Sequence, residues 1–286
     1  MKELTIISGK GGTGKTSILG AFATLAGNSV ICDCDVDAAN LHILLRPEIK
    51  ETHPFYGEKK ADILPLLCTQ CGLCQDLCRF QAIKEFQVNL YACEGCALCQ
   101  HVCPVGAVVL HDHLSGHWYV SETQWGPMVH AKLGIAQGNS GLLVNVVRKK
   151  ARELAKEKKL SLLLSDGPPG IGCPVISSLA GTDMALIVTE PTASGIHDLA
   201  RIAKVAGTFG CQRAVCINKY NLDETNCQRI EDLAGQMGIP VLGKIPFDPN
   251  VTEAVLKGIP VTLLESSEAV SSIRNLWEQV VNMLGV

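Results

Sequence analysis

A glycine-rich stretch near the start of the chain has the residue types that bind phosphate. Residues 8–16 read SGKGGTGKT and satisfy G-x-x-x-x-G-K-[ST]. Glycines let backbone N–H groups converge on phosphate oxygens, the lysine contacts the terminal phosphates, and the threonine hydroxyl binds Mg²⁺. A glycine-rich turn without a ligand is the alternative. The complete pattern favours a nucleotide site formed by Gly9, Lys10, Gly11, Gly12, Thr13, Gly14, Lys15 and Thr16.

Two groups of carboxylates follow apolar runs that have the character of strands. Asp166 comes after Leu-Leu-Leu-Ser and precedes the rigid turn Gly-Pro-Pro-Gly, where a second carboxylate would hold Mg²⁺ through water. Asp33 and Asp35 share one strand face and leave that strand at its carboxyl end, where open α/β sheets bind ligands. One of them can orient water, and the alternative is a solvated acidic turn.

Eight of the fourteen cysteines form two copies of C-x₂-C-x₂-C-x₃-C at one constant offset. This is the spacing of bacterial two-cluster ferredoxins, in which the fourth cysteine of each run ligates the other cluster. Zinc and disulfides are less consistent with tandem runs in this register. We therefore expect one 4Fe-4S cluster on Cys68, Cys71, Cys74 and Cys103, and a second on Cys93, Cys96, Cys99 and Cys78.

One residue departs from the ferredoxin pattern. Cys103 is followed by Pro104, whereas Cys78 is followed by Arg79. We expect a less rigid exit turn and a different potential for the neighbouring cluster, with ligation unaffected. The cysteines outside the two runs are expected to be small buried hydrophobic residues, except for Cys173, discussed below.

The elements around these motifs predict a doubly wound, mostly parallel α/β fold. A strand at 4–7 precedes the glycine loop and a helix at 16–26 follows it. Further strands are predicted at 29–33, 160–164, 184–188, 214–217 and 241–245, and further helices at 196–208, 224–237 and 270–284. The pattern breaks where the cysteines are dense. The sequence predicts a P-loop domain of residues 1–53 and 112–286 with an inserted α+β ferredoxin-like domain at 54–111, in which no regular periodicity is found.

Composition restricts the setting of the protein. The chain has 286 residues, 47% of them hydrophobic, and a formal net charge of −3, so no basic field for nucleic acid is expected. The opening MKELTIISGK lacks the apolar core of a signal peptide, and no apolar run is long enough to span a bilayer. We therefore expect a cytoplasmic protein. Residues 270–284 have helical apolar spacing without a basic face, which favours packing on the sheet over membrane binding.

The motifs at 9–16, 33–35 and 166–170 resemble those of the deviant Walker A ATPases, the group of MinD, ParA, Mrp and the nitrogenase iron protein. This resemblance implies binding of ATP or ADP with Mg²⁺ and a nucleotide-sandwich homodimer. It implies that Lys10, which phosphate binding alone does not require, reaches the partner's phosphates like an arginine finger. Asp35 matches the switch I aspartate that positions water, Asn40 the end of that switch, and Asp166 the switch II aspartate.

Further residues are assigned only through this resemblance. It implies an adenine-binding role for Asn218 and Lys219, and for Pro246, Phe247 and Asp248. Cys173 lies at an offset from Asp166 like that of a cluster ligand in the nitrogenase iron protein, so a dimer would bring two copies together; an inert thiol is the alternative. MinD-superfamily ATPases with an inserted ferredoxin domain form a known group, which the chain resembles.

Three functions fit these expectations. In the first, ATP binding and hydrolysis by a homodimer control electron transfer through the two clusters to a redox partner. In the second, the protein is a cluster or metal carrier of Mrp type that acts on apo-metalloproteins. In the third, a positioning ATPase needs no redox chemistry, but this leaves eight cysteines without a role.

Overall fold

The computed structural model describes residues 1–134, 138 and 140–286, which divide into two compact units. The larger unit comprises Met1–Thr52, Trp118–Lys132 and Ser140–Val286. The cysteine unit comprises His53–His117 and Leu133–Asn139. No helix within the described residues is long and apolar enough to cross a membrane.

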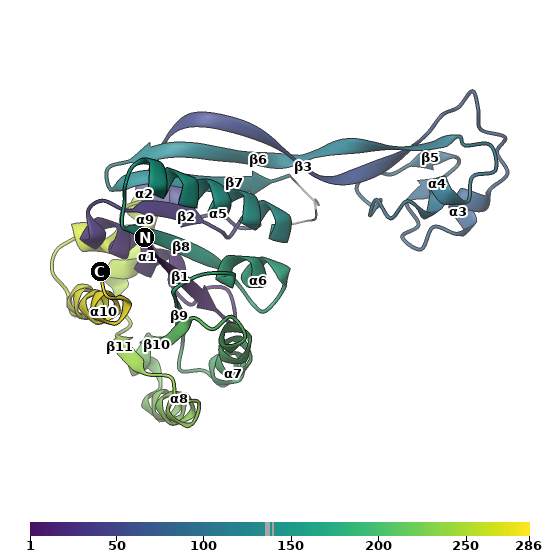
Figure 1. Cartoon of the computed structure of the whole chain (residues 1–286). Helices are drawn as coiled ribbons and strands as arrows, with labels where there is room; N and C mark the ends of the chain where they lie inside the picture. Colours follow the sequence, from purple (N-terminus) through teal and green to yellow (C-terminus); the bar gives the residue numbers. More distant parts are fainter. Residues whose placement is uncertain (135–137, 139) are drawn as a thin grey trace. The chain divides into compact units, whose positions relative to one another are not determined.

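The larger unit is built on a sheet whose central strands are parallel (Figure 1). The strand order is β11-β10-β9-β1-β8-β2-β7-β6-β3. Its strands are β1 (Lys2–Ser8), β2 (Val30–Asp33), β7 (Gly126–Leu133), β8 (Leu162–Pro169), β9 (Met184–Thr189), β10 (Gln212–Asn218) and β11 (Val241–Ile245), completed by β3 (Glu48–Ile63) and β6 (Val108–Thr123). The predicted α/β class and mostly parallel sheet are confirmed.

Side chains alternate across the sheet and form a separate core on each face. Leu4 and Ile6 of β1 belong to the core that the first set of helices covers, whereas Ile7 belongs to the other. The first set is α1 (Lys15–Ala26), α2 (Leu41–Leu45), α9 (Pro249–Lys257) and α10 (Glu268–Leu284), with η2 (Val261–Leu263). The second is α6 (Cys173–Leu179), α7 (Ala193–Gly207) and α8 (Glu224–Gln236); α5 (Ser140–Glu157) contacts α6 and β2, and η1 (Tyr220–Leu222) precedes α8.

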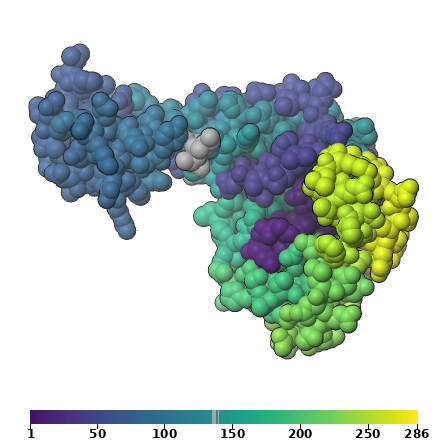
Figure 2. Space-filling view, turned by 180° about the vertical axis from the view of Figure 1, so that it is seen from behind, coloured from purple at the N-terminus to yellow at the C-terminus, as the bar shows by residue number. Residues whose placement is uncertain are grey.

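The last helix packs onto the body of the larger unit, as its apolar spacing predicts. Ile273, Leu276 and Val280 of α10 are buried in the first core, and the ring of Trp277 lies 4.9 Å from that of Phe22 in α1. Figure 2 shows this C-terminal segment in yellow against the larger unit. The apolar face of α10 is therefore occupied within the chain.

The cysteine unit contains long strands that the sequence did not predict. β3 and β6 have 16 residues each, and each begins in one unit and ends in the other. Most of β3 up to Glu58 is exposed or half-buried, so its sequence carries no apolar alternation from which to predict a strand. Its pairing partner in the sheet, β6, supplies the hydrogen bonds that its composition does not suggest.

The cysteine repeat forms two matching helical turns. α3 (Leu73–Asp76) begins after Gly72 at φ 84°, and α4 (Leu98–His101) begins after Ala97 at φ 65°. A short antiparallel pair, β4 (Ile83–Lys84) with β5 (Gln87–Val88), lies between them in the chain. The core of this unit combines a few aliphatic residues with cysteines of both runs.

Candidate functional site: a phosphate loop and two cysteine-lined cavities

The glycine loop joins β1 to α1 in the conformation that phosphate binding needs. Gly12 and Gly14 have φ 79° and 92°, and a Cβ atom at Gly14 would collide with the side chain of Asn218. That side chain donates from Nδ2 to the carbonyl oxygen of Thr13 at 2.8 Å. The amide thus fixes the loop at the N-terminus of α1, where free N–H groups favour an anion.

Lys15 is the buried cation of this loop. It is 6% exposed, and its Nζ donates to Ser8 Oγ at 2.9 Å. Burial lowers the pKa of Lys15, while Asp166 and Asp35 act in the opposite direction. The ammonium therefore lies near the carboxylates of Asp166 and Asp35, in a site that an anionic ligand would complete. Ser8 was missed in the sequence because only its three-dimensional contact to Lys15 marks it.

Thr16 and Asp166 form the part of the site suited to Mg²⁺. Thr16 Oγ1 donates to Asp166 Oδ2 at 2.6 Å, and Asp166 Oδ1 is buried with no hydrogen-bond partner among the described residues. Burial raises the pKa of Asp166 to about 6, despite the opposing effect of Lys15. Mg²⁺ prefers oxygen ligands, and this site offers the hydroxyl of Thr16 and both carboxylate oxygens of Asp166, one of which has no partner in the described part of the chain. This donor set fits the ion.

Asp33 shapes the acidic loop after β2. It pairs in register with Asp166, and burial followed by the charge of Asp166 raises its pKa well above the ordinary value. Its carboxylate accepts from Asp35 N at 3.1 Å and from Leu41 N at 3.3 Å. Asp33 therefore fixes the backbone of the loop that carries Asp35 and Asn40. Its role at the site is to position that loop and not to bind a ligand.

A pocket of about 540 Å³ opens at this edge of the larger unit, within the range of about 300–1,000 Å³ usual for ligand sites. Desolvation raises the pKa of Asp35, which faces the pocket. Of the predicted site residues, the pocket brings together Gly11, Gly12, Gly14, Lys15, Thr16, Asp35 and Asn40. Pro169, from the predicted rigid turn, also lines it, and the rest of its wall was not predicted: Ser17, Ala38, Ile43, Leu44 and Val255.

Lys10 lies outside this pocket and contacts its own chain. Its Nζ is 3.3 Å from Glu190 Oε2 and 3.2 Å from each of the hydroxyls of Thr192 and Ser194. Glu190 also pairs with Lys219 at 2.5 Å, so one carboxylate holds two lysines. Glu190 was not predicted, because an isolated glutamate after a strand carries no motif.

The predicted adenine-binding residues do not line the pocket. Besides its pair with Glu190, Lys219 donates to the carbonyl of Gly12 at 3.4 Å. Phe247 N donates to Asn221 Oδ1, and Asp248 caps α9 by accepting from Asn250 N at 2.9 Å. Asn218 and Lys219 thus brace the phosphate loop, while Pro246, Phe247 and Asp248 form the turn between β11 and α9. Their adenine role stays a prediction.

The cysteine runs line two separate cavities, each with four cysteines. The first cavity is lined by Cys68, Cys71, Cys74 and Cys103. The second cavity is lined by Cys93, Cys96, Cys99 and Cys78. In both cavities the fourth cysteine comes from the other run, the same grouping as in the predicted ligand sets.

Backbone donors reach the fourth cysteine of each run in the same way. Ala82 N donates to Cys78 Sγ at 3.4 Å, and Ala107 N donates to Cys103 Sγ at 3.2 Å. The pKa of Cys103 is lowered, chiefly by hydrogen bonding from the backbone at Val105. Such bonds favour a thiolate, the form that ligates iron. Thiols in fours, with N–H donors, fit a 4Fe-4S cluster; among the described residues no group of three or more His, Cys, Asp or Glu has the geometry for a single metal ion.

The remaining cysteines divide into buried and exposed. Cys32, Cys34, Cys216 and Cys227 are buried, and Cys211 is half-buried. Burial raises the pKa of Cys216 to about 12, as expected for an inert thiol. Cys173 is exposed as the first residue of α6.

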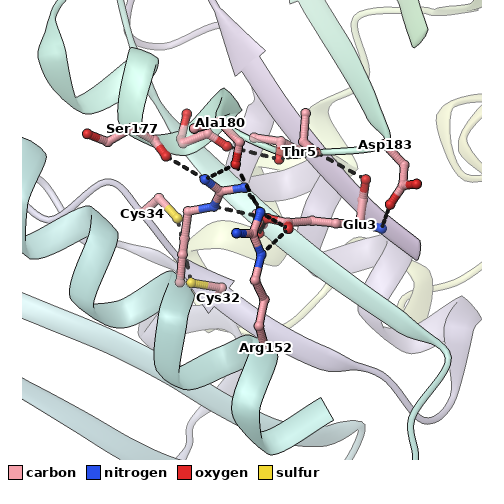
Figure 3. Close-up of polar contacts among 12 residues, drawn as sticks. Glu3, Thr5, Cys32, Cys34, Arg152, Ser177, Ala180 and Asp183 are labelled. Atoms are coloured by element: carbon pink, nitrogen blue, oxygen red, sulfur yellow. Dashed lines mark hydrogen bonds and ion pairs between the residues drawn. The ribbon is translucent and has the colours of Figure 1, made fainter. Parts of the chain in front are cut away.

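An ion network at the start of β1 ties several elements together (Figure 3). Glu3 Oε1 accepts from Arg148 Nη2 at 2.6 Å, and Glu3 Oε2 accepts from Arg152 Nε at 2.8 Å. Arg148 also donates to the carbonyls of Ser177 and Ala180 at the end of α6. With side chains 2% and 3% exposed, Glu3 and Arg148 form a buried pair that fixes α5 and α6 to β1.

Comparison with known proteins gives a consistent result. A family model described as the CobQ/CobB/MinD/ParA nucleotide binding domain matches residues 4–261. An uncharacterized protein of Methanocaldococcus jannaschii is 32% identical over 282 residues, which cover 97% of this chain and 96% of that protein. An iron-sulfur cluster carrier protein of the same organism is 25% identical over 298 residues, covering 97% and 84%.

Solved structures share the fold. The cell division ATPase MinD of Pyrococcus furiosus has a TM-score of 0.62 at 20% identity, with 99% of both chains covered. The septum site-determining protein MinD of Pyrococcus horikoshii, complexed with Mg-ADP, has a TM-score of 0.61 at 21% identity, with 99% of this chain and 97% of that chain covered. Together with the loop geometry, the family match means that this chain belongs to the CobQ/CobB/MinD/ParA family of nucleotide-binding proteins.

Proposed function

We propose that this protein is a homodimeric ATPase in which ATP binding and hydrolysis control electron transfer through two 4Fe-4S clusters to a partner redox protein. The observation that carries the proposal is the crossed grouping of cysteines around two cavities in a chain that also has a complete phosphate loop. A nucleotide-binding protein without redox chemistry does not need the cysteine cavities, and a ferredoxin does not need the phosphate loop.

The residues of the phosphate loop have distinct tasks in this proposal. The N–H groups at the start of α1 and Lys15 bind the β- and γ-phosphates of ATP. Thr16 and Asp166, which hydrogen-bond to each other in the structure, would hold Mg²⁺, and the ion would neutralise charge on the phosphates. Asp35, which lines the same pocket, orients the attacking water.

Lys10 requires a second copy of the chain. In the single chain its ammonium rests on Glu190, Thr192 and Ser194, although its side chain is 31% exposed and able to move. In the dimer it stabilises the charge that develops on the partner's γ-phosphate. The contact with Glu190 is thus the resting position, and dimer closure replaces it.

The cysteine unit supplies the redox chemistry. A 4Fe-4S cluster bound there supplies one-electron transfer. The eight cysteines would hold the clusters as thiolates. Ala82 N and Ala107 N donate to the sulfurs of Cys78 and Cys103, and aliphatic residues pack beside the cysteines. Cys71 and Cys96 are exposed, which gives a partner protein a short path to each cavity.

The chain itself offers a route from nucleotide to cysteines. The loop with Asp35 and Asn40 leads into α2, which ends at Leu45, and β3 begins at Glu48 and continues into the cysteine unit. A change in that loop on ATP binding is therefore transmitted along a single strand. In this proposal the nucleotide-dependent conformation of the loop is the switch, and the cysteine unit responds to it.

The test uses anaerobically prepared full-length protein reduced with dithionite. We expect Mg-ATP to change the rate at which an oxidised redox protein takes electrons from it. Lys15→Ala removes nucleotide binding and this effect, while the iron content stays unchanged. An electron-transfer rate that is the same with and without Mg-ATP would contradict the proposal.

A second function, delivery of iron-sulfur clusters, is favoured by two observations. A relative that covers 97% of this chain is named an iron-sulfur cluster carrier protein, and Cys173 is an exposed thiol at the start of α6. Incubation with an apo-acceptor distinguishes the functions: loss of iron-sulfur absorbance from the donor favours the carrier, and retention with reversible bleaching favours electron transfer. In the same assay, unchanged iron and zinc in dimeric Cys173→Ser removes the role of that thiol.

A further inference from the structure

The cysteine unit contains a buried cation that neither the sequence motif nor the proposed function uses. Lys60 of β3 is 4% exposed, although lysine is rarely buried without a partner. Its Nζ donates to the carbonyl oxygen of Cys93 at 2.5 Å and to Glu58 Oε2 at 3.1 Å. A buried ammonium group therefore lies directly behind a cysteine of the second cavity.

The two cavities are otherwise built alike. Each has four cysteines, one crossing from the other run, and each crossing cysteine accepts an N–H bond from the residue four positions later. The internal repeat thus gives both sites the same ligands and matching backbone donors. Differences between them must come from residues other than these ligands and donors.

Charge is such a difference. Among the described residues, no Lys, Arg, Asp or Glu lines the first cavity. The second cavity has Arg79 and Glu94 in its wall, but these are exposed, opposite in sign and screened by water. Lys60 is neither exposed nor screened, so its charge acts on the second cavity through a medium of lower dielectric constant.

We propose that Lys60 makes the cluster of the second cavity easier to reduce than that of the first, with Glu58 limiting the effect. This inference rests on the proposed function, because it needs a cluster in each cavity. Reduction adds one negative charge to a cluster, and a nearby cation stabilises that form and raises the reduction potential. Electrons supplied by an external reductant then collect at the Cys93 side of the unit.

The ion pair makes the proposal testable in both directions. Lys60→Met removes the cation and leaves Glu58, so the second-cavity cluster becomes harder to reduce. Glu58→Gln leaves the cation uncompensated, so the same cluster becomes easier to reduce. A purely structural role for the pair predicts no such change of sign.

The experiment is a dithionite titration of the full-length, anaerobically prepared protein followed by electron paramagnetic resonance. Cys96→Ser and Cys71→Ser, which change one exposed ligand in the second and first cavity respectively, assign the two signals. At the potential where the wild-type second-cavity cluster is half reduced, we expect Lys60→Met to lower the reduced-to-oxidised ratio about tenfold, about 59 mV for one electron. Glu58→Gln should raise it, and the first-cavity signal should stay constant.

Lys59→Met is the matched control, because Lys59 is the neighbouring lysine on β3 but its side chain is 61% exposed and pairs loosely with Asp112 at 3.9 Å. It should shift neither signal. If Lys60→Met fails to fold, Lys60→Arg, which should keep the wild-type potential, and Glu58→Gln still test the sign. Two intact signals that move in neither Lys60→Met nor Glu58→Gln would overturn the role of Lys60, whereas missing iron in the wild type would overturn the proposed function instead.

Discussion

The phosphate loop and the cysteine unit differ in how complete they are without a ligand. In the larger unit, hydrogen bonds already fix the site residues: Lys15 to Ser8, Thr16 to Asp166, and Asn218 to the loop backbone. Two large apolar cores hold these residues in place. In the cysteine unit, by contrast, cysteines that face the cavities are themselves a large part of the core.

The nucleotide and the clusters therefore have different structural roles. A nucleotide joins a site whose scaffold is already stable, so it changes the function of the larger unit more than its fold. A cluster would fill the centre of a unit of fewer than 80 residues, a size at which metals often supply part of the stability. Experiments that perturb one unit and measure the other test this distinction.

Removal of iron should have the largest effect and should be confined to the cysteine unit. Chelation of the reduced protein removes the iron that the cysteines share. Backbone amides of residues 64–107 should then lose essentially all hydrogen-exchange protection. Protection of β1, β8 and β9 should stay as in the untreated protein, because their core contains no iron ligand. Equal loss of protection in both units would show that they do not fold separately.

Lys10→Ala should reduce ATP turnover about 10³-fold or more, the loss expected when a charge-stabilising finger is removed. Binding of nucleotide to the single chain should persist, because Lys10 does not line the pocket. Steady-state phosphate release and equilibrium nucleotide binding measure the two quantities. Lys2→Ala, which removes another partly exposed lysine of the same segment, is the control, and wild-type turnover in Lys10→Ala would contradict the dimer mechanism.

Arg148→Met should destabilise the larger unit by about 3 kcal/mol, the lower end for breaking a buried pair, because among the described residues Glu3 keeps only the partly exposed Arg152 as its ionic partner. Denaturant unfolding followed by circular dichroism measures this loss. Lys158→Met breaks an exposed pair with Glu122 and should cost at most about 1 kcal/mol. Iron content should be unchanged in both variants, and loss of iron in Arg148→Met would connect the two units.

Acid should weaken Mg-nucleotide binding through Asp166. Burial raises its pKa to about 6, so below that pH the carboxyl is protonated and the proton competes with Mg²⁺. The affinity for Mg-ADP should fall about tenfold for each pH unit below 6 and level off above it. In Asp166→Asn binding should be weak at every pH; a wild-type affinity independent of pH between 4 and 7 would contradict this role.

The sequence predicted the larger unit well because its strands and motifs are local. The glycine loop, the acidic loop after β2 and the apolar strands each carry their signal within a few residues, and the structure brings the loop residues together with Asp35 and Asn40. Cysteine spacing carried equally local information. The family match agrees with the resemblance inferred from these motifs.

The remainder depended on contacts between residues far apart in the chain. β3 has no apolar alternation, since most of it up to Glu58 is exposed or half-buried, and in β6 buried and half-buried residues follow one another without a period of two. The role of Glu190 is visible only in the structure, where it pairs with Lys10 and Lys219. Lys60 stands in the charged run Glu-Lys-Lys-Ala-Asp, which reads as a solvated surface, and only the fold reveals that it is buried.

Iron and nucleotide counted on the same sample show whether one chain combines an ATP site with two cluster sites. Anaerobically purified protein should contain about eight iron atoms per chain, four for each cluster, and should bind Mg-ATP. Lys15→Ala should keep the iron and lose the ATP, and Cys96→Ser should perturb the iron and keep the ATP. Wild-type protein with far less iron, or with no bound nucleotide, would contradict the account.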